Sequence, residues 1–137
     1  MAAVHVAVGV ILNKNQQVLI ARRPMGSHQG GLWEFPGGKV ETGESLEQAL
    51  FRELKEELAI EVSECSALVT IEHDYGDKLV LLDVCLVREF TGDAVGMEGQ
   101  VLQWIGLDQL REFEFPAANK PIVELLTALP EDGPLSS

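Results

Sequence analysis

Carboxylates concentrate in one short stretch of the chain, directly after a pair of glycines. The segment from Gly37 to Ile60 is rich in glutamate and includes Glu44, Glu47, Glu53, Glu56 and Glu57. At about 100° per residue, Glu53, Glu56 and Glu57 fall in one sector of a helix together with apolar side chains. Like charges repel there, and burying them is costly unless a cation joins them. The alternative is an ordinary solvated helix whose glutamates pair with neighbouring basic residues.

A divalent metal resolves this conflict of charge and burial. Oxygen ligands without nitrogen or sulfur favour Mg²⁺, with Mn²⁺ as a substitute, and Mg²⁺ commonly combines a few carboxylates with substrate phosphates. The implied substrate is a phosphate ester or anhydride, attacked by water that the metal or a carboxylate activates. The histidines and cysteines show no spacing typical of a zinc site.

The composition limits the possible partners. The chain has 137 residues and a formal charge of −12, from 22 acidic and 10 basic side chains, so its mean field repels nucleic acid polymers. A small polyphosphate remains compatible if metal cations neutralise the site. The apolar segment Met1–Leu12 lacks a basic leader and is shorter than the ~20 residues of a membrane span, which predicts a strand of a cytoplasmic protein without a membrane partner. We expect a monomer, with Cys65 and Cys85 as buried thiols.

The elements that position the glutamates can be predicted from periodicity. Ser45 is a good N-cap and Gln48 completes a capping box, so a helix should run from there to about Leu58. Alternation predicts strands over 4–12 and 18–22, paired as a hairpin, with residues 60–68 as a mixed connection. Further strands are predicted at 69–75 and 78–90, as an antiparallel hairpin, and at 101–105, with a closing helix over 117–129. Residues 1–130 form one predicted domain and residues 131–137 a disordered tail.

The glycine and glutamate spacing is similar to a known family motif. Gly38, Glu44 and the run Arg52–Ile60 resemble the Nudix box of the Nudix hydrolases. The resemblance implies the α/β fold of that family, an α/β/α sandwich with a mixed β-sheet between helices. Ala59 is the one departure, because the family usually has a glycine there, which ends the helix.

The resemblance also implies roles for individual residues. Metal binding would use the Gly37 carbonyl with Glu53, Glu56, Glu57 and Glu98. Glu53 would be the general base, with Glu44 or Glu98 assisting, and Arg52 would orient the carboxylates by ion pairing. Water would attack the β-phosphorus and release a nucleoside monophosphate and pyrophosphate.

Segments outside the box indicate the base. Residues 20–23, 33–39, 98–100 and 115–121 resemble family members that hydrolyse 8-oxo-dGTP. The implied substrate is an oxidised purine nucleoside triphosphate, 8-oxo-dGTP and also 8-oxo-GTP, whose removal cleanses the nucleotide pool. Two alternatives remain open: hydrolysis of another nucleotide, such as a pyrimidine triphosphate, and nucleotide binding without hydrolysis.

Asn119 is the candidate for base choice. Guanine presents two acceptors, O6 and N7, whereas 8-oxoguanine carries a hydrogen on N7, so an amide that offers a donor beside an acceptor matches the oxidised base. The alternative is that Asn119 caps the final helix. Phe35 could stack on the base or pack in the core, and Arg23 and Lys78 could contact the nucleotide or be solvated surface residues.

Overall fold

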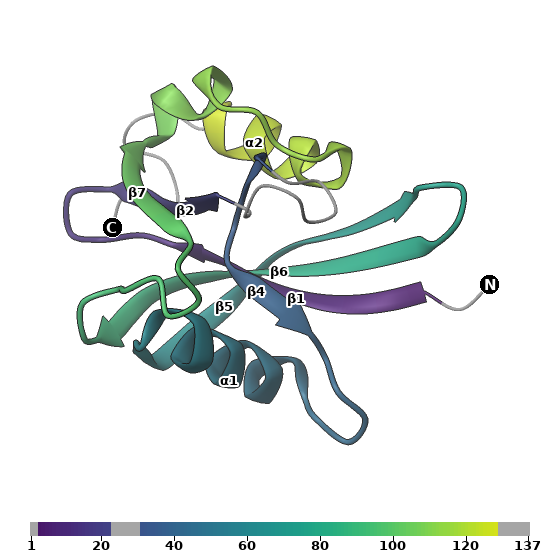
Figure 1. Ribbon diagram of the computed structural model, residues 1–137, viewed down its shortest axis with the longest axis horizontal. Helices are drawn as coiled ribbons and strands as arrows, with labels where there is room; N and C mark the ends of the chain where they lie inside the picture. The colour runs from purple at the N-terminus through teal and green to yellow at the C-terminus, as the bar shows by residue number, and fades with distance from the viewer. Residues whose placement is uncertain (1–2, 23–30, 129–137) are drawn as a thin grey trace.

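Two β-sheets lie between two α-helices in the computed structural model, which describes residues 3–22 and 31–128 (Figure 1). The larger sheet has the strand order β4 (Gly37–Lys39), β1 (Ala3–Ile11), β6 (Leu79–Thr91) and β5 (Glu61–Asp74). The smaller sheet has the order β3 (Trp33–Glu34), β2 (Gln17–Arg22) and β7 (Val101–Gly106). Because β1 runs parallel to β6 and antiparallel to β4, the predicted mixed sheet is confirmed. Arg23 and residues 131–137, predicted as a contact and a tail, lie outside the described residues.

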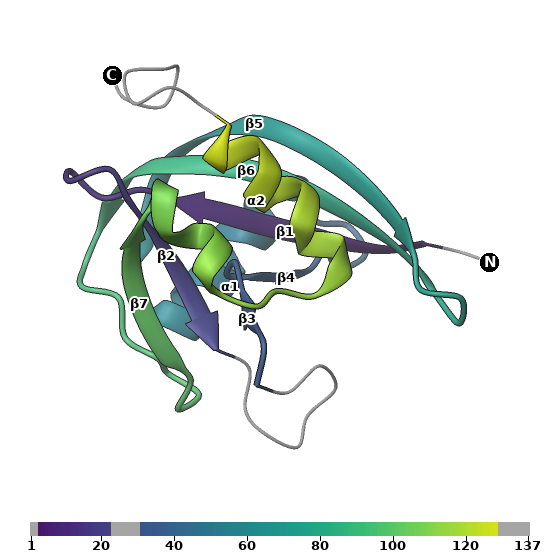
Figure 2. The ribbon, with the colours of Figure 1, turned by 90° about the horizontal axis from the view of Figure 1, so that it is seen from above.

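The helices cover opposite faces of the larger sheet (Figures 1 and 2). On one face α1 (Leu46–Leu58) packs on alternate residues of β1, including Ala7 and Ile11. On the other, Val8 and Val10 join a second core with α2 (Lys120–Thr127) and the 3₁₀ turns η1 (Leu107–Glu112) and η2 (Ala117–Asn119). This alternation explains why β1 is apolar on both faces. No helix within residues 3–22 and 31–128 has the length and apolar character needed to cross a membrane.

The predicted start and end of α1 are confirmed. The Ser45 hydroxyl oxygen accepts from the Gln48 backbone N–H at 3.1 Å, and the Ser45 backbone N–H donates to Gln48 Oε1 at 2.8 Å. These two bonds satisfy amides that a helix start leaves without partners. One apolar stripe then fixes the helix on the sheet through four buried residues: Ala49, Leu50, Leu54 and Leu58.

The predicted hairpin between the first two strands is wrong. The segments share a single bridge, between Leu12 and Val18, and β2 then leaves to pair with β3 and β7. Strand β6 pairs along one edge of β1, and β4 pairs with residues 6–8 on the other edge, so a hairpin partner could pair only with the end of β1. A local turn therefore connects two different sheets.

Two further segments differ from the prediction. Residues 61–68, expected as a mixed connection, are the first half of β5, where irregularities between Val62 and Val69 break the alternation that marks a strand. Residues Gly37–Lys39, for which no strand was predicted, form β4. A side chain at Gly37 would overlap the Ala7 carbonyl oxygen, so only glycine allows β4 to lie this close to β1.

The two cysteines are thiols on the neighbouring strands β5 and β6. Cys85 is buried under α1, and burial raises the pKa of its thiol to about 12. Cys65 is half-buried, and its pKa is also raised, first by burial and then by the nearby Glu47. The prediction of buried thiols is confirmed for Cys85, and both groups stay protonated and unreactive near neutral pH.

Ala59 ends α1 in the left-handed conformation that glycine normally adopts, with φ 60° and ψ 31°. Its N–H still donates to the Lys55 carbonyl oxygen at 3.0 Å, so the departure from the family motif leaves the helix end intact. The left-handed conformation costs an L-residue roughly 1–2 kcal/mol. We expect Ala59→Gly to raise the free energy of unfolding by about 0.5–1 kcal/mol, since greater freedom of the unfolded chain offsets part of the relief.

Urea denaturation measures this change. The control is Ala67→Gly, at an exposed position within β5, which should lower stability because glycine weakens a strand interior. If Ala59→Gly lowered stability as Ala67→Gly does, the cost assigned to the left-handed alanine would be incorrect.

Candidate functional site

A cavity of about 440 Å³ joins the glycine-rich strand to the start of the final helix. One end is formed by Gly37, Gly38 and Glu57, with Glu98 from the loop before β7. The other end has the side chains predicted to select the base: Phe35, Lys78 and Asn119. The structure therefore brings part of the predicted metal set and most of the predicted base set into one space.

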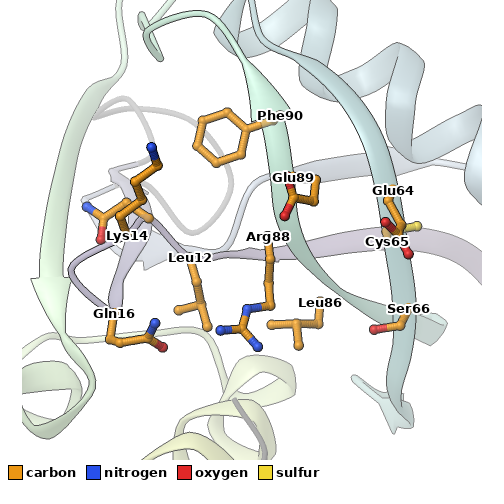
Figure 3. Close-up of a pocket in the computed structure, with 11 residues that line it drawn as sticks. Leu12, Lys14, Gln16, Glu64, Cys65, Ser66, Leu86, Arg88, Glu89 and Phe90 are labelled. Carbon is orange, nitrogen blue, oxygen red and sulfur yellow. The ribbon is translucent and has the colours of Figure 1, made fainter. Parts of the chain in front are cut away.

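A larger cavity, of about 630 Å³, lies between the β1–β2 turn and the far ends of β5 and β6 (Figure 3). Its polar side chains include Lys14, Arg88, Glu64 and Glu89, and none of the predicted site residues lines it. Its charges are mixed, and no cluster of carboxylates forms there. The smaller cavity is therefore the candidate site, although it holds less volume.

Arg52 forms a two-pronged ion pair with Glu44. Its Nε lies 2.7 Å from Glu44 Oε2 and its Nη2 lies 2.9 Å from Glu44 Oε1. The guanidinium lowers the pKa of the Glu44 carboxyl to about 2, with help from the Glu41 backbone N–H, and the pKa of Arg52 is raised in turn. Because both Glu44 oxygens are engaged, Glu44 acts on the site by holding Arg52.

The same guanidinium reaches the helix glutamates. Arg52 Nη1 lies 2.9 Å from Glu53 Oε1 and 3.4 Å from Glu56 Oε2. The Glu53 carboxylate also lies against Gly38, where any side chain would overlap it. The Glu53 carboxylate is thus held between Arg52 and the backbone of Gly38. Arg52 contacts its Oε1 atom rather than Oε2.

Glu57 is the buried carboxylate of the site. Its Oε2 atom is shielded from solvent and has no hydrogen-bond partner in the described part of the chain. Burial, followed by the negative charges of Glu53, Glu34 and Glu98, raises its pKa to about 8, and the backbone N–H of Gly37 offsets only part of this. A buried oxygen among like charges requires either a proton or a cation.

The end of α1 holds the loop that carries Glu98. The last carbonyls of a helix lack helical partners. Here the Glu57 carbonyl oxygen accepts from the Met97 N–H at 2.9 Å, and the Leu58 carbonyl oxygen accepts from the Val95 N–H at 2.9 Å. Gln100 Oε1 also accepts from the Glu98 N–H at 2.8 Å. These bonds explain how an exposed loop residue comes close enough to influence the Glu57 carboxyl.

The donor set fits a divalent metal that shares its coordination with a ligand. The unpartnered Glu57 oxygen, the adjacent Glu53 carboxylate and the Gly37 backbone offer hard oxygen donors. Within residues 3–22 and 31–128, however, no group of three or more Asp, Glu, His or Cys side chains is arranged to hold an ion. Glu56 is 62% exposed and turned toward Arg52. Such a partial set suits Mg²⁺, which usually completes its shell with water and phosphate oxygens.

Glu34 is a site residue that the sequence prediction missed. It lines the cavity and adds to the charge that raises the pKa of Glu57. Sequence position offered a signal, because Glu34 stands three residues before Gly37, in a segment already assigned to the site for Phe35. The prediction assigned Phe35 to the site but did not include the neighbouring Glu34.

The surroundings of Asn119 test the alternative that its side chain caps the final helix. Asn119 occupies the N-cap position of α2, but its side chain makes no capping hydrogen bond and has no partner among the described residues. Its amide is thus available to a ligand. Phe35 is only 4% exposed and stacks on Phe115 at 5.1 Å, so it packs in the core while also lining the cavity. Lys78 lines the cavity without an ion pair to described residues, and Arg23 lies outside them.

The chain is similar to a known family and to several known proteins. A family model described as a NUDIX domain matches residues 7–125. An 8-oxo-dGTP diphosphatase of Escherichia coli strain K12 is 39% identical over 94% of this chain and 100% of that protein. A CTP pyrophosphohydrolase of the same strain is 36% identical over 89% of this chain and 90% of that protein. A solved structure from an analysis of MutT of Aliivibrio salmonicida and Vibrio cholerae has a TM-score of 0.83 and 41% identity, covering 93% of this chain and 98% of that one.

The buried Glu57 carboxyl predicts an unusual pH dependence of the metal-free protein. Its pKa is about 8 when folded against an ordinary value of 4.5, so the folded state retains a proton that the unfolded chain releases. The contribution of Glu57 to the free energy of unfolding is fully present below about pH 4.5 and is lost as the pH rises to about 8. We expect Glu57→Gln to remove this loss, so that the variant gains at least about 1.4 kcal/mol over the wild type across that interval.

Thermal unfolding with EDTA at several pH values measures the difference between variant and wild type. Glu47→Gln, on an exposed position of the same helix, is the control and should follow the wild-type curve. Parallel curves for Glu57→Gln and wild type would show that the Glu57 carboxyl is not strained by its surroundings.

Proposed function

The chain belongs to the NUDIX domain family, and we propose that it hydrolyses 8-oxo-dGTP, and 8-oxo-GTP, to the monophosphate and pyrophosphate. One observation carries the proposal: a single cavity joins the buried Glu57 carboxylate to the side-chain amide of Asn119, and neither Glu57 Oε2 nor that amide has a hydrogen-bond partner among the described residues. The first fits a metal and phosphates, and the second fits a base edge. Such an enzyme keeps oxidised guanine out of the nucleotide pool and thereby prevents mutation.

The proposed metal is Mg²⁺, for which Mn²⁺ could substitute, held by the Gly37 carbonyl, Glu53, Glu56, Glu57 and Glu98. The cation, when bound, neutralises charge on the phosphates and favours attack by water. Glu57 supports this assignment because its buried oxygen has no other partner in the described part of the chain. Glu56 and Glu98 are more exposed, so their side chains are free to adjust to a bound nucleotide.

Glu53 is the proposed general base. Arg52 holds its Oε1 atom at 2.9 Å and Gly38 lies against the carboxylate, so Oε2 is the atom that accepts a proton from the attacking water. The water oxygen bonds to the β-phosphorus and the bond from this phosphorus to the oxygen bridging to the α-phosphorus breaks. The nucleoside monophosphate is the leaving group and keeps the bridging oxygen, while the water oxygen becomes part of the pyrophosphate. Glu44 supports the step through Arg52, whose orientation it fixes.

Base choice is assigned to Asn119. Its amide presents a donor and an acceptor side by side, which pairs with the N7–H and O6 of 8-oxoguanine but leaves a mismatch with guanine. A buried polar group left unpaired by the wrong substrate can provide about 10⁴-fold discrimination. Lys78 and Arg23 are the proposed cations for the nucleotide, and Phe35 contributes a wall of the pocket rather than a freely exposed ring.

A pyrimidine triphosphate is the second candidate substrate, because a relative of 36% identity carries the name CTP pyrophosphohydrolase. Both candidates use the same hydrolytic residues and differ only at the base end. The net charge of −12 supports a free nucleotide rather than a nucleic acid polymer as the substrate. The cytoplasmic location and the monomeric state stay predictions.

A panel of nucleotides tests the substrate. With Mg²⁺ and pyrophosphate detection, we expect kcat/KM for 8-oxo-dGTP to exceed that for dGTP, CTP and dCTP by about 10³-fold or more, because only the oxidised base satisfies the Asn119 amide. Equal rates on 8-oxo-dGTP and dGTP would refute the base assignment, and a preference for CTP would select the second candidate. Nucleotide binding without release of pyrophosphate would indicate a binding domain.

Glu53→Gln tests the general base. The amide preserves shape but cannot take up a proton at this site, so we expect kcat to fall by at least about 10²-fold. Circular dichroism and thermal unfolding should show an intact fold. Glu47→Gln provides the matched control on the same helix and should retain full activity. An active Glu53→Gln enzyme would move the base role to another carboxylate.

A further inference from the structure

Tyr75 lies at the base end of the cavity, beside residues assigned to the nucleotide. It ends the β5 side of the β5–β6 turn, where its backbone N–H donates to the Lys78 carbonyl oxygen at 2.9 Å. The turn itself is tight: Gly76 has φ 94°, and its N–H donates to Asp74 Oδ1 at 2.7 Å. Tyr75 and Lys78 are therefore held by the same short turn.

The hydroxyl of Tyr75 reaches the segment that carries Asn119. The Ala118 backbone N–H donates to Tyr75 Oη at 3.2 Å. Ala118 belongs to η2, is 2% exposed, and directly precedes Asn119, so this bond satisfies a buried amide at the foot of α2. Figure 2 shows the start of α2 on the side of the molecule where the β5–β6 turn lies.

The surroundings of Asn119 show why this bond matters for its position. Its own amide makes no capping bond, and its backbone N–H is held only within the turn, by the Pro116 carbonyl oxygen at 2.9 Å. Among the described residues, the bond to Tyr75 is the side-chain hydrogen bond that connects η2 to the β5–β6 turn. The aromatic ring is itself fixed, because it packs edge-on to His73 at 4.5 Å and against the core.

We infer that Tyr75 is a positioning residue for base selection: through its bond to the Ala118 N–H, its hydroxyl fixes the Asn119 amide relative to Lys78. This rests on the proposed function, which assigns base recognition to Asn119. A discriminating amide must be held within a few tenths of an ångström, because a loose amide can shift to accept either base. Tyr75, at the β5–β6 turn, restrains the segment that carries Asn119 through its bond to Ala118.

Tyr75→Phe is the test, because it keeps the ring and removes only the hydroxyl. We expect the ratio of kcat/KM for 8-oxo-dGTP over dGTP to fall about five-fold, the size expected for one lost hydrogen bond. The change should appear as a higher KM for 8-oxo-dGTP, with kcat and the Mg²⁺ requirement unchanged. Thr127→Val is the matched control, because it removes a hydrogen-bonded hydroxyl of α2 away from η2 and should leave the ratio unchanged.

A double-mutant cycle separates positioning from direct contact. If Tyr75 acts through Asn119, adding Tyr75→Phe to Asn119→Ala produces no further loss of discrimination. Additive losses would overturn the inference, because Tyr75 would then contact the nucleotide itself. An equal fall in kcat for both nucleotides would also overturn it, by showing a general structural effect.

Hydrogen exchange of the Ala118 amide tests the bond without any nucleotide. We expect faster exchange at Ala118 in Tyr75→Phe than in the wild type, with unchanged exchange in α1. Unchanged exchange at Ala118 would contradict the inference. If exchange accelerates but the wild-type enzyme does not prefer 8-oxo-dGTP, the proposed substrate fails while the structural link between the turn and η2 stands.

Discussion

The arrangement of the site depends on two glycines, Gly37 and Gly38, because neighbouring atoms occupy the space that a side chain would need. At Gly37 any side chain would overlap the Ala7 carbonyl oxygen, and at Gly38 it would overlap the Glu53 carboxylate. Because both positions are bare, β4 pairs with β1 while α1 packs its glutamates directly against β4. The same contact affects both the site and the fold, since β4 is an edge strand of the larger sheet and also lies against α1. A side chain at Gly37 would therefore disturb strand pairing, and one at Gly38 would displace the Glu53 carboxylate.

Negative charge is distributed unevenly over this framework. Arg52 compensates Glu44, which precedes α1, and Glu53 of α1 with close contacts, and the pKa of Glu44 is low as a result. Glu57 is buried, its Oε2 atom has no hydrogen-bond partner among the described residues, and the pKa of its carboxyl is high. The helix α1 thus carries two kinds of glutamate. Glu53 is held in place by Arg52, whereas Glu57 has an oxygen that favours a cation. The division is a consequence of helix periodicity, since Arg52 reaches Glu53 and Glu56 but lies on a different side from Glu57.

Local rules explain which parts could be predicted from the sequence. The boundaries of α1 were predictable, since Ser45 and Gln48 cap it through bonds that span only three residues. The β1–β2 hairpin was mispredicted because pairing depends on which strands compete for an edge, and β4 and β6 come much later in the chain. The first half of β5 was hidden by its irregular register. For the site, the glutamate spacing indicated the carboxylates, but the exposure of Glu56, the burial of Glu57 and the involvement of Glu34 depend on tertiary packing.

The two ends of the cavity belong to different parts of the fold, and the proposed function assigns hydrolysis to one end and base choice to the other. The phosphate end belongs to α1, β4 and the Glu98 loop, whereas the base end belongs to η2, the β5–β6 turn and the aromatic core under α2. If Asn119 selects the base, a change near Asn119 or Tyr75 alters the preferred base while the Arg52 network stays intact. Relatives of similar identity have names that specify either 8-oxo-dGTP or CTP, which is the pattern expected if base choice can change independently of hydrolysis. The proposed function thus assigns hydrolysis to the glutamate helix and base choice to the packing around Asn119.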